Sequence, residues 1–293
     1  MSIINQKIKF SPLIIGVMNW GVWGKNMSQA EMSILINQCV DEGLTTFDHA
    51  AIYGGYTTEA AFGEAFSQTG LSRREVQLIS KCGIQYPSQQ TPYGIKHYNY
   101  SASEVIRSVE QSLKNLQTDY LDVLLFHRPS PLMFLEEILE ALTKLFDSGK
   151  ILSFGVSNFE PAKIDLIKKV VPIAYNQIEF SLTHHTPLTD GQLDYMQLHN
   201  IQPMAWKPLG EVFSSSFNNP ILLDLLNNLA TKYNCTVDIL LLAWVMQHPT
   251  KVLPVIGSTS IDRISNQKAA INIKLSLEDW FEMYTLSMGS KVP

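Results

Sequence analysis

The chain contains the run Leu121-Asp122-Val123-Leu124-Leu125-Phe126-His127, which is apolar along most of its length and ends on an ionisable residue. Residues 76–81 have the same form and end on Lys81, and a shorter run ends on Asp48. Short apolar runs of this kind favour buried strands. Barrels of alternating strands and helices use the C-terminal ends of such strands to point catalytic side chains at one mouth. The three runs therefore predict a polar site at the mouth of an α/β barrel.

Strand-like and helix-like segments alternate along the whole chain. Short strands that are apolar on both faces are typical of a parallel sheet covered by helices. The predicted strands are residues 13–18, 45–48, 76–81, 121–127, 152–157, 174–179, 202–206 and 253–256. The predicted helices are residues 28–42, 101–116, 134–148, 162–170, 190–199, 222–233, 237–247 and 261–269, with a last helix from near Leu277. This order predicts one (β/α)8 TIM barrel over residues 1–293.

Local signals add detail to this prediction. Ser28 with Glu31, and Ser101 with Glu104, have the spacing of a capping box. Residues 82–100 and 208–220 are long connections that each follow a strand, so we expect functional loops on the C-terminal face. Residues 7–10 are expected to form a short hairpin that closes the opposite end.

Composition excludes several classes of protein. The net charge of −5 argues against nucleic acid as a partner, because phosphate binding needs concentrated Lys and Arg. The three cysteines are far apart and show no metal-ligand spacing, so neither disulfides nor a metal site are expected. The apolar run near the N-terminus lacks a basic flank and a cleavage site, and no apolar stretch is long enough to cross a bilayer. We expect a cytoplasmic monomer that acts on a small molecule and has no membrane partner.

The predicted site offers general acid chemistry. Tyr53 is the candidate proton donor, although a free phenol has a pKa near ~10. A neighbouring ammonium favours the phenolate, and Lys81 can supply it, held by a salt bridge to Asp48. His127 can donate a hydrogen bond to a substrate oxygen. The alternative is an ordinary buried ion pair between Asp48 and Lys81, with Tyr53 and His127 as core residues.

Motifs over nearly the full length carry a resemblance to a known family. They are residues 47–56 (FDHAAIYGGY), 80–84 (SKCGI), 127–129 (HRP), 154–159 (FGVSNF), 176–179 (NQIE), 205–210 (AWKPLG) and 254–258 (PVIGS). In this order they resemble the aldo-keto reductase family, in particular its bacterial YdhF-type oxidoreductases. The resemblance implies reduction of an aldehyde, ketone or quinone by NADPH. No glycine-rich Rossmann or P-loop motif is present to suggest another mode of nucleotide binding.

The resemblance also assigns cofactor contacts. Hydrogen bonds to the nicotinamide carboxamide are implied for Ser157, Asn158 and Gln177, and stacking on the ring for Trp206. Lys207, Pro208, Leu209 and Gly210 would run beneath the pyrophosphate. Gly257, Ser258 and Thr259 precede a helix whose N-terminus attracts phosphate. Arg263 would bind the 2′-phosphate, and Asn266 would lie near the adenine.

Some positions depart from the family pattern. Trp206 stands where the family commonly has Tyr or Phe, and Lys207 stands where it commonly has a small hydroxyl residue. Gly257 stands where Lys is frequent. The last change removes one possible 2′-phosphate ligand, so NADH remains possible. A solvated surface role is the alternative for Arg263. We expect Trp20 and Tyr56 to line the substrate mouth, with ordinary loop packing as the alternative.

Two other functions remain open at this point. The chain could be a sensor or regulatory protein that binds NADP(H) with little turnover. It could also be a barrel enzyme with no redox chemistry, because a fold does not fix a function. Binding of a dinucleotide would discriminate between the second class and the other two.

Overall fold

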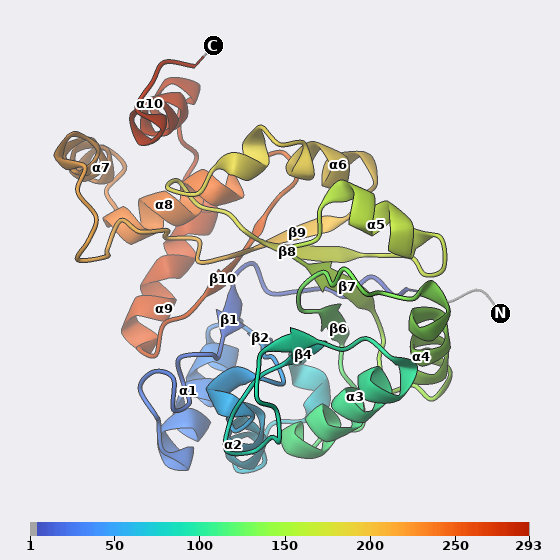
Figure 1. Ribbon diagram of the computed structural model, residues 1–293. Coiled ribbons are helices and arrows are strands. Elements are labelled where there is room, and N and C mark those ends of the chain that lie inside the picture. The colour runs from blue at the N-terminus through green and yellow to red at the C-terminus, as the bar shows by residue number, and fades with distance from the viewer. Residues whose placement is uncertain (1–4, 293) are drawn as a thin grey trace.

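The computed structural model describes residues 5–292 and contains a closed parallel barrel (Figure 1). Around the barrel the strands follow the order β1-β10-β9-β8-β7-β6-β3-β2. Each strand matches one of the eight predicted segments. The strands are β1 (Ile14–Gly16), β2 (Thr46–Asp48), β3 (Gln77–Cys82), β6 (Val123–Phe126), β7 (Phe154–Ser157), β8 (Tyr175–Glu179), β9 (Gln202–Trp206) and β10 (Leu253–Ile256). The prediction of a (β/α)8 barrel is therefore confirmed.

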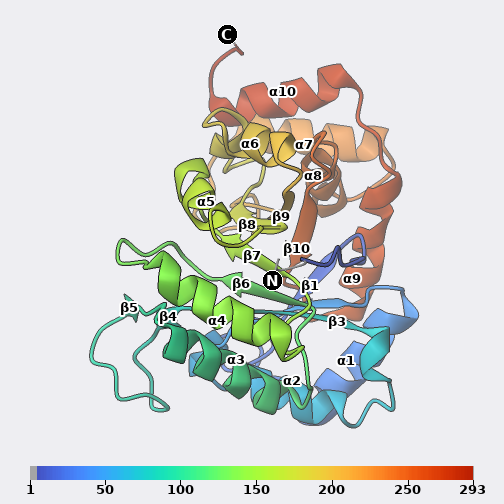
Figure 2. The same cartoon turned by 90° about the vertical axis from the view of Figure 1, so that its right-hand side faces the viewer.

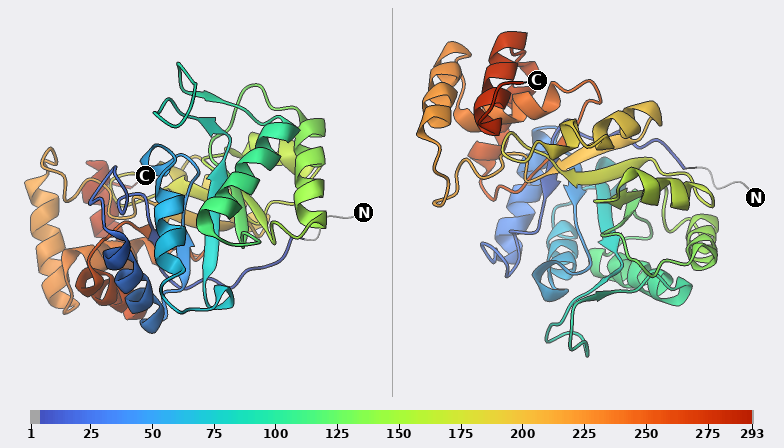
Figure 3. Two further views of the ribbon diagram at one scale, coloured as in Figure 1. Left: turned by 90° about the horizontal axis from the view of Figure 1, so that it is seen from below. Right: turned by 45° about the horizontal axis from the view of Figure 1, so that its top comes forward.

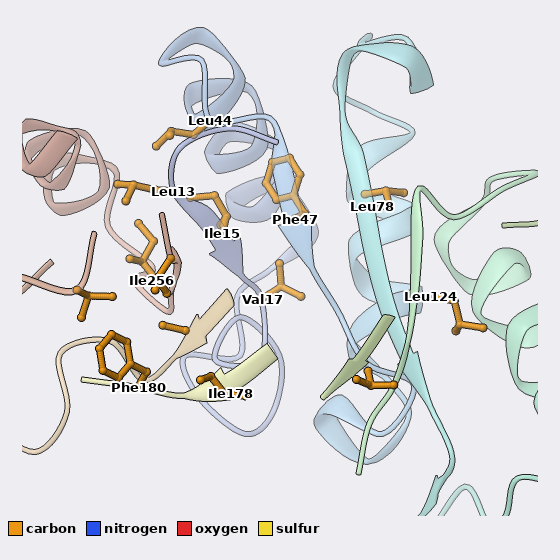
Figure 4. Packing of buried hydrophobic residues seen from close by; sticks show 14 of the residues in the cluster. Leu13, Ile15, Val17, Leu44, Phe47, Leu78, Leu124, Ile178, Phe180 and Ile256 are labelled. Atoms are coloured by element: carbon orange, nitrogen blue, oxygen red, sulfur yellow. The ribbon is translucent and has the colours of Figure 1, made fainter. Parts of the chain in front are cut away.

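Side chains alternate between the interior of the barrel and the layer beneath the helices. Ile14, Ile79 and Leu125 belong to the interior cluster, whereas their chain neighbours Leu13 and Leu78 pack in the outer layer. Figure 4 shows this outer packing around Ile15, Phe47, Leu124 and Ile178. Because successive strand residues face opposite sides, the residue two positions beyond an interior residue also faces the interior.

The helices cover the outside of the barrel (Figures 1 and 2). They are α1 (Gln29–Asp41), α2 (Thr58–Phe66), α3 (Ala102–Leu116), α4 (Leu135–Asp147), α5 (Pro161–Lys168), α6 (Gln192–Leu198), α7 (Pro220–Lys232), α8 (Val237–Met246), α9 (Ile261–Gln267) and α10 (Leu277–Met288). All the predicted helices are present. No helix of the described residues could span a bilayer alone, and α7 and α8, bent by 88° at their junction, reach the necessary length and hydropathy only together.

The helix α2 was not predicted from the sequence. Gly63 interrupts its pattern, and a glycine inside a helix is unfavourable by about 1 kcal/mol relative to alanine. The structure shows why glycine is needed there. A Cβ at this position would lie 2.1 Å from the carbonyl oxygen of Asn115 on α3, so the two helices approach closely only without a side chain.

The two capping predictions have different outcomes. Ser28 and Glu31 form the reciprocal capping box at the start of α1. The prediction for Ser101 is wrong, since its side chain forms no capping hydrogen bond at α3. Glu104 instead accepts hydrogen bonds from Gln85 and Arg107, which draw its carboxylate away from the helix terminus.

The long connection after β3 is partly ordered into an antiparallel pair, β4 (Ile84–Gln85) and β5 (His97–Tyr98). This excursion stands out from the barrel in both Figure 2 and Figure 3. The hairpin expected at residues 7–10 is wrong, because these residues form no strand. Ile8 and Phe10 nevertheless pack against the interior cluster, and the Ile8 amide donates to the Tyr175 hydroxyl.

Candidate active site

The alternation of the strands places four polar residues at the mouth of the barrel. Lys81, His127 and Gln177 each lie two positions after an interior residue, Ile79, Leu125 and Tyr175 respectively. Lys81 is the penultimate residue of β3, His127 directly follows β6, and Gln177 is the middle residue of β8. Asp48 ends β2, and its backbone pairs with Gly16 of β1. Their side chains converge because they share a face and an end of the barrel.

Lys81 is the centre of a buried hydrogen-bond network. Its Nζ donates to Asp48 Oδ2 at 2.7 Å, to the His49 carbonyl oxygen at 2.8 Å and to the Tyr53 hydroxyl at 3.0 Å. All three ammonium protons therefore have acceptors. Gln177 Nε2 donates to the other Asp48 oxygen at 2.9 Å. The network fixes the phenol of Tyr53 against a cation.

Burial and the charge of Lys81 shift the pKa of Tyr53 in opposite directions. Burial raises the pKa of the phenol above its ordinary value, while the Lys81 ammonium opposes that rise. The expectation that Lys81 lowers the pKa describes only the smaller of the two effects. The phenol is thus held in its protonated form at neutral pH, as a proton donor requires.

Lys81 and His127 have defined protonation states as well. Burial alone would lower the pKa of Lys81, but Asp48 and Tyr53 raise it above its ordinary value, so the lysine stays charged. Burial and the charges of Lys81, Arg128 and Lys96 hold the pKa of His127 well below its ordinary value. The neutral His127 ring lies 6.1 Å from the Tyr53 ring, measured between centroids, in an edge-to-face arrangement.

A second set of polar residues forms the wall beside this network. Ser157 Oγ donates to the Gln177 carbonyl oxygen at 2.9 Å and accepts from Asn158 Nδ2 at 2.8 Å. Trp206 Nε1 donates to Asn158 Oδ1 at 2.9 Å. The guanidinium carbon of Arg128 lies 5.4 Å from the Trp206 ring centroid. Trp206 is therefore held in a fixed orientation at the end of β9.

A cavity of about 730 Å³ connects these two sets of residues. Most of the predicted site residues line it: Asp48, Tyr53, His127, Ser157, Asn158, Gln177, Trp206, Lys207, Pro208, Leu209, Gly257, Ser258 and Arg263. Lys81 does not line the cavity itself but contacts two lining residues, Asp48 and Tyr53. Gly210, Thr259 and Asn266 do not line the cavity. Within residues 5–292 no group of three His, Cys, Asp or Glu side chains is arranged to hold a metal ion.

The two predicted substrate-mouth residues lie elsewhere. Trp20 is completely buried, packs against Phe47 and Phe62, and donates from Nε1 to the Ser258 carbonyl oxygen. Tyr56 packs beside the cavity in a small cluster, and its hydroxyl accepts from the Tyr86 amide. Trp23 is half-exposed in the same loop and is the tryptophan that lines the cavity. The prediction that Trp20 lines the substrate mouth is therefore wrong, and the residue three positions later takes that place.

Sequence reasoning missed several lining residues, which are Gly16, Met18, Asn19, Trp23, Ile52, Ile84, Lys96, Arg128, Val255, Ile256 and Gln267. Arg128 could have been predicted from the sequence, because it directly follows His127 at the end of a strand. Lys96 had none, because only the path of the β4–β5 excursion brings it to the cavity.

His49 is a buried histidine beside the network with no hydrogen-bond partner on either ring nitrogen among the described residues. Its ring packs edge-to-face on Phe62 at 4.4 Å, and burial lowers its pKa from 6.5 to about 3. Below pH 6.5 the unfolded state binds a proton that the folded state does not, so stability falls as the pH falls toward 3.

We therefore expect His49→Leu to flatten the acid side of the stability profile. The slope of the unfolding free energy between pH 6.5 and 3 should fall by up to about 1.4 kcal/mol per pH unit. Urea unfolding at a series of pH values measures this slope, and His199→Leu on an exposed site is the control. An unchanged slope would show that His49 already carries a proton in the folded state.

The fold is an α/β barrel whose mouth holds a tyrosine hydroxyl hydrogen-bonded to a buried lysine. The family model for the aldo/keto reductase family matches residues 12–287, and the chain belongs to this family. Its members are NAD(P)H-dependent oxidoreductases. The chain is 39% identical to the uncharacterized oxidoreductase YcsN of Bacillus subtilis, over 98% of each chain. It is also 39% identical to the oxidoreductase YdhF of Escherichia coli, over 100% of this chain and 99% of the other.

A solved structure supports the same assignment. An aldo/keto reductase from Klebsiella pneumoniae, crystallised with NADP and acetate, superposes with a TM-score of 0.78 at 29% identity. The match covers 95% of this chain and 92% of the other. The resemblance read from the sequence motifs is thus confirmed at the level of the family.

Proposed function

We propose that the protein reduces an aldehyde, ketone or quinone to the alcohol with NADPH. The observation that carries the proposal is the contact of 3.0 Å between Lys81 Nζ and the Tyr53 hydroxyl, backed by Asp48. An ordinary buried ion pair would not need a tyrosine at the cavity wall. Here the cation is aimed at a phenol that itself lines the cavity.

The side chains divide the work of proton transfer. A carbonyl oxygen placed between Tyr53 and His127 receives hydrogen bonds from both groups. Negative charge that develops on this oxygen is stabilised by the two donors, and the Tyr53 hydroxyl then gives up its proton. The Lys81 ammonium stabilises the resulting phenolate. Asp48 keeps Lys81 charged and in place, and Gln177 holds the remaining Asp48 oxygen.

The cavity has the chemical groups that an extended dinucleotide needs. Bound NADPH supplies the hydride. The Gln177 side chain faces the cavity and uses its amide nitrogen on Asp48, which leaves the amide oxygen as an acceptor for a carboxamide. Both polar atoms of Asn158 already serve Ser157 and Trp206, so its main contribution is to fix the Trp206 ring as a stacking surface. Lys207 and Arg263 also line the cavity, and they follow β9 and β10, where the family resemblance would place the phosphates.

Arg263→Ala is expected to weaken NADPH binding at least about tenfold while NADH binding changes little, since a charged hydrogen bond contributes about 1.5–3 kcal/mol. Arg263 is exposed at the first turn of α9 and lines the cavity without an ion-pair partner among the described residues. Titration of tryptophan fluorescence with both cofactors measures the effect. Arg74→Ala, exposed in the turn η2 (Arg73–Glu75), is the matched control. Equal losses for the two cofactors would remove Arg263 from the 2′-phosphate site.

The direct test is consumption of NADPH with a panel of aldehydes, ketones and quinones. NADPH oxidation that requires the carbonyl compound supports the proposed reductase function. Binding of NADPH without turnover on any member of the panel favours the sensor. Absence of dinucleotide binding would contradict both and favour a barrel enzyme without redox chemistry.

A further inference from the structure

The catalytic cavity carries an excess of positive charge that the proposed proton transfer does not use. Its lining includes four cationic side chains, Lys96, Arg128, Lys207 and Arg263, whereas Asp48 is the one lining carboxylate of the described residues. Of these cations, Lys207 is paired with Glu211, which lies outside the lining. Asp48 is already paired with Lys81 beneath it. The lining therefore offers charge to an anion at more than one place.

These cations lie at two different ends of the barrel mouth. Lys207 follows β9 and Arg263 follows β10, the strands that lead to the expected phosphate sites. Arg128 follows β6, and Lys96 lies just before β5 in the excursion between β3 and β6. On the closed barrel, β7, β8 and β9 separate β6 from β10. The backbones of Lys96 and Arg128 therefore lie on the side of His127, and the Arg128 side chain extends from there over Trp206 at the end of β9.

Neither of these two residues is neutralised within the described part of the chain. None of the ion pairs there involves Lys96 or Arg128. The Arg128 backbone is anchored at both polar atoms by the Tyr100 hydroxyl, which fixes where the side chain begins. The guanidinium then lies over one face of Trp206, a preorganised position for a planar cation.

Both charges act on the reacting end of the cavity. Arg128 and Lys96 each contribute to the lowered pKa of His127, and Arg128 also acts on the pKa of Tyr53. Lys96 and Arg128 line the same cavity as Tyr53 and His127, so a substrate bound there can reach all four side chains. A second, smaller hollow behind Trp206 also borders Arg128, but Glu160 and Glu179 line it, so an anion is disfavoured there.

We propose that Arg128 and Lys96 form a subsite for an anionic group on the substrate, so that the preferred substrates are carbonyl compounds bearing a carboxylate or sulfonate. This inference rests on the proposed reductase function and adds the substrate class. A guanidinium binds such oxyanions in a bidentate manner, and the exposed Lys96 adds a second charge from the β4–β5 excursion. An anion bound by Arg128 and Lys96 would hold the carbonyl group of the same substrate molecule at a fixed distance from the subsite, beside Tyr53 and His127.

The test compares three aldehydes of nearly the same shape: 4-formylbenzoate, 4-formylbenzenesulfonate and the neutral methyl ester of the first. NADPH oxidation is followed with wild type, Arg128→Gln, Lys96→Gln and Lys114→Gln, where Lys114 is an exposed residue of α3. In wild type, kcat/KM for at least one anion should exceed that for the ester by about 10- to 100-fold. This ratio should collapse in Arg128→Gln, decrease in Lys96→Gln and persist in Lys114→Gln. The preferred anion identifies the oxyanion that the subsite accepts.

Two other outcomes distinguish failure of the anionic subsite from failure of the proposed reductase function. If the ester, or 4-nitrobenzaldehyde as a neutral reference, is reduced as well as the anions, or if the anions neither react nor inhibit, the anionic subsite is overturned and the reductase stands. If wild type oxidises NADPH with none of the four aldehydes and with no member of the wider panel, the reductase itself fails. Arg128→Lys guards against a folding defect, because it keeps the charge and loses only the bidentate geometry.

Discussion

Tyr53→Phe is expected to lower kcat by at least about 10² and up to about 10⁴, the usual range for loss of a general acid. The substitution removes a single oxygen and leaves the ring, which packs near Trp23 and His127. Cofactor binding should change by less than about twofold, since the expected cofactor contacts come from β7 to β10. The loss therefore belongs to kcat and not to the affinity for NADPH.

The measurement is single-turnover oxidation of NADPH beside a fluorescence titration of cofactor binding. Tyr56→Phe is the matched control, because it deletes the same oxygen three residues away, from a side chain outside the cavity lining. It should retain the turnover of wild type. A Tyr53→Phe enzyme with near wild-type kcat would show that another group protonates the product.

Lys81→Met is the second large effect, and it acts on both activity and stability. Removal of the ammonium leaves the Asp48 carboxylate, which is almost completely buried, without its cation. Breaking a buried pair in this way costs about 3–5 kcal/mol of folding stability. Turnover should fall as well, because the Tyr53 phenolate loses the charge that stabilises it.

A double variant separates these two consequences. In Asp48→Asn/Lys81→Met the uncompensated charge is removed, so urea unfolding should recover more than half of the lost stability. Turnover should stay as low as in Lys81→Met, since the cation is still absent. Recovery of turnover in the double variant would mean that Lys81 serves only to neutralise Asp48. Wild-type stability in Lys81→Met would mean that Asp48 takes up a proton in its place.

The order of strands and helices was readable from the sequence for a local reason. Each strand, such as Gln202–Trp206, is short, apolar and bounded by polar segments, and this signal needs no distant partner. Asp48, Lys81 and His127 were found by the same signal, as ionisable residues at the ends of such runs. Tyr53 was found only because it belongs to the motif that follows Asp48.

Other features depend on contacts between segments far apart in the chain. The helix α2 was missed because Gly63 is explained by α3, a neighbour that the local pattern does not contain. Trp20 and Trp23 are three positions apart in one loop, and only the packing of Phe47 and Phe62 decides that the first is buried and the second faces the cavity.

The sequence by itself determined the barrel and its family, and it singled out the four residues that we propose for proton transfer, Asp48, Tyr53, Lys81 and His127. These depend on the period of the strands and on motifs of a few adjacent residues, which are properties of the chain alone. Only the tertiary structure decided the balance of charges around Tyr53, where burial outweighs the effect of Lys81. It also decided that Arg128 and Lys96, which lie on different connections, meet at one cavity. Burial and convergence depend on distances through space, and loop residues have no periodic pattern from which those distances could be read.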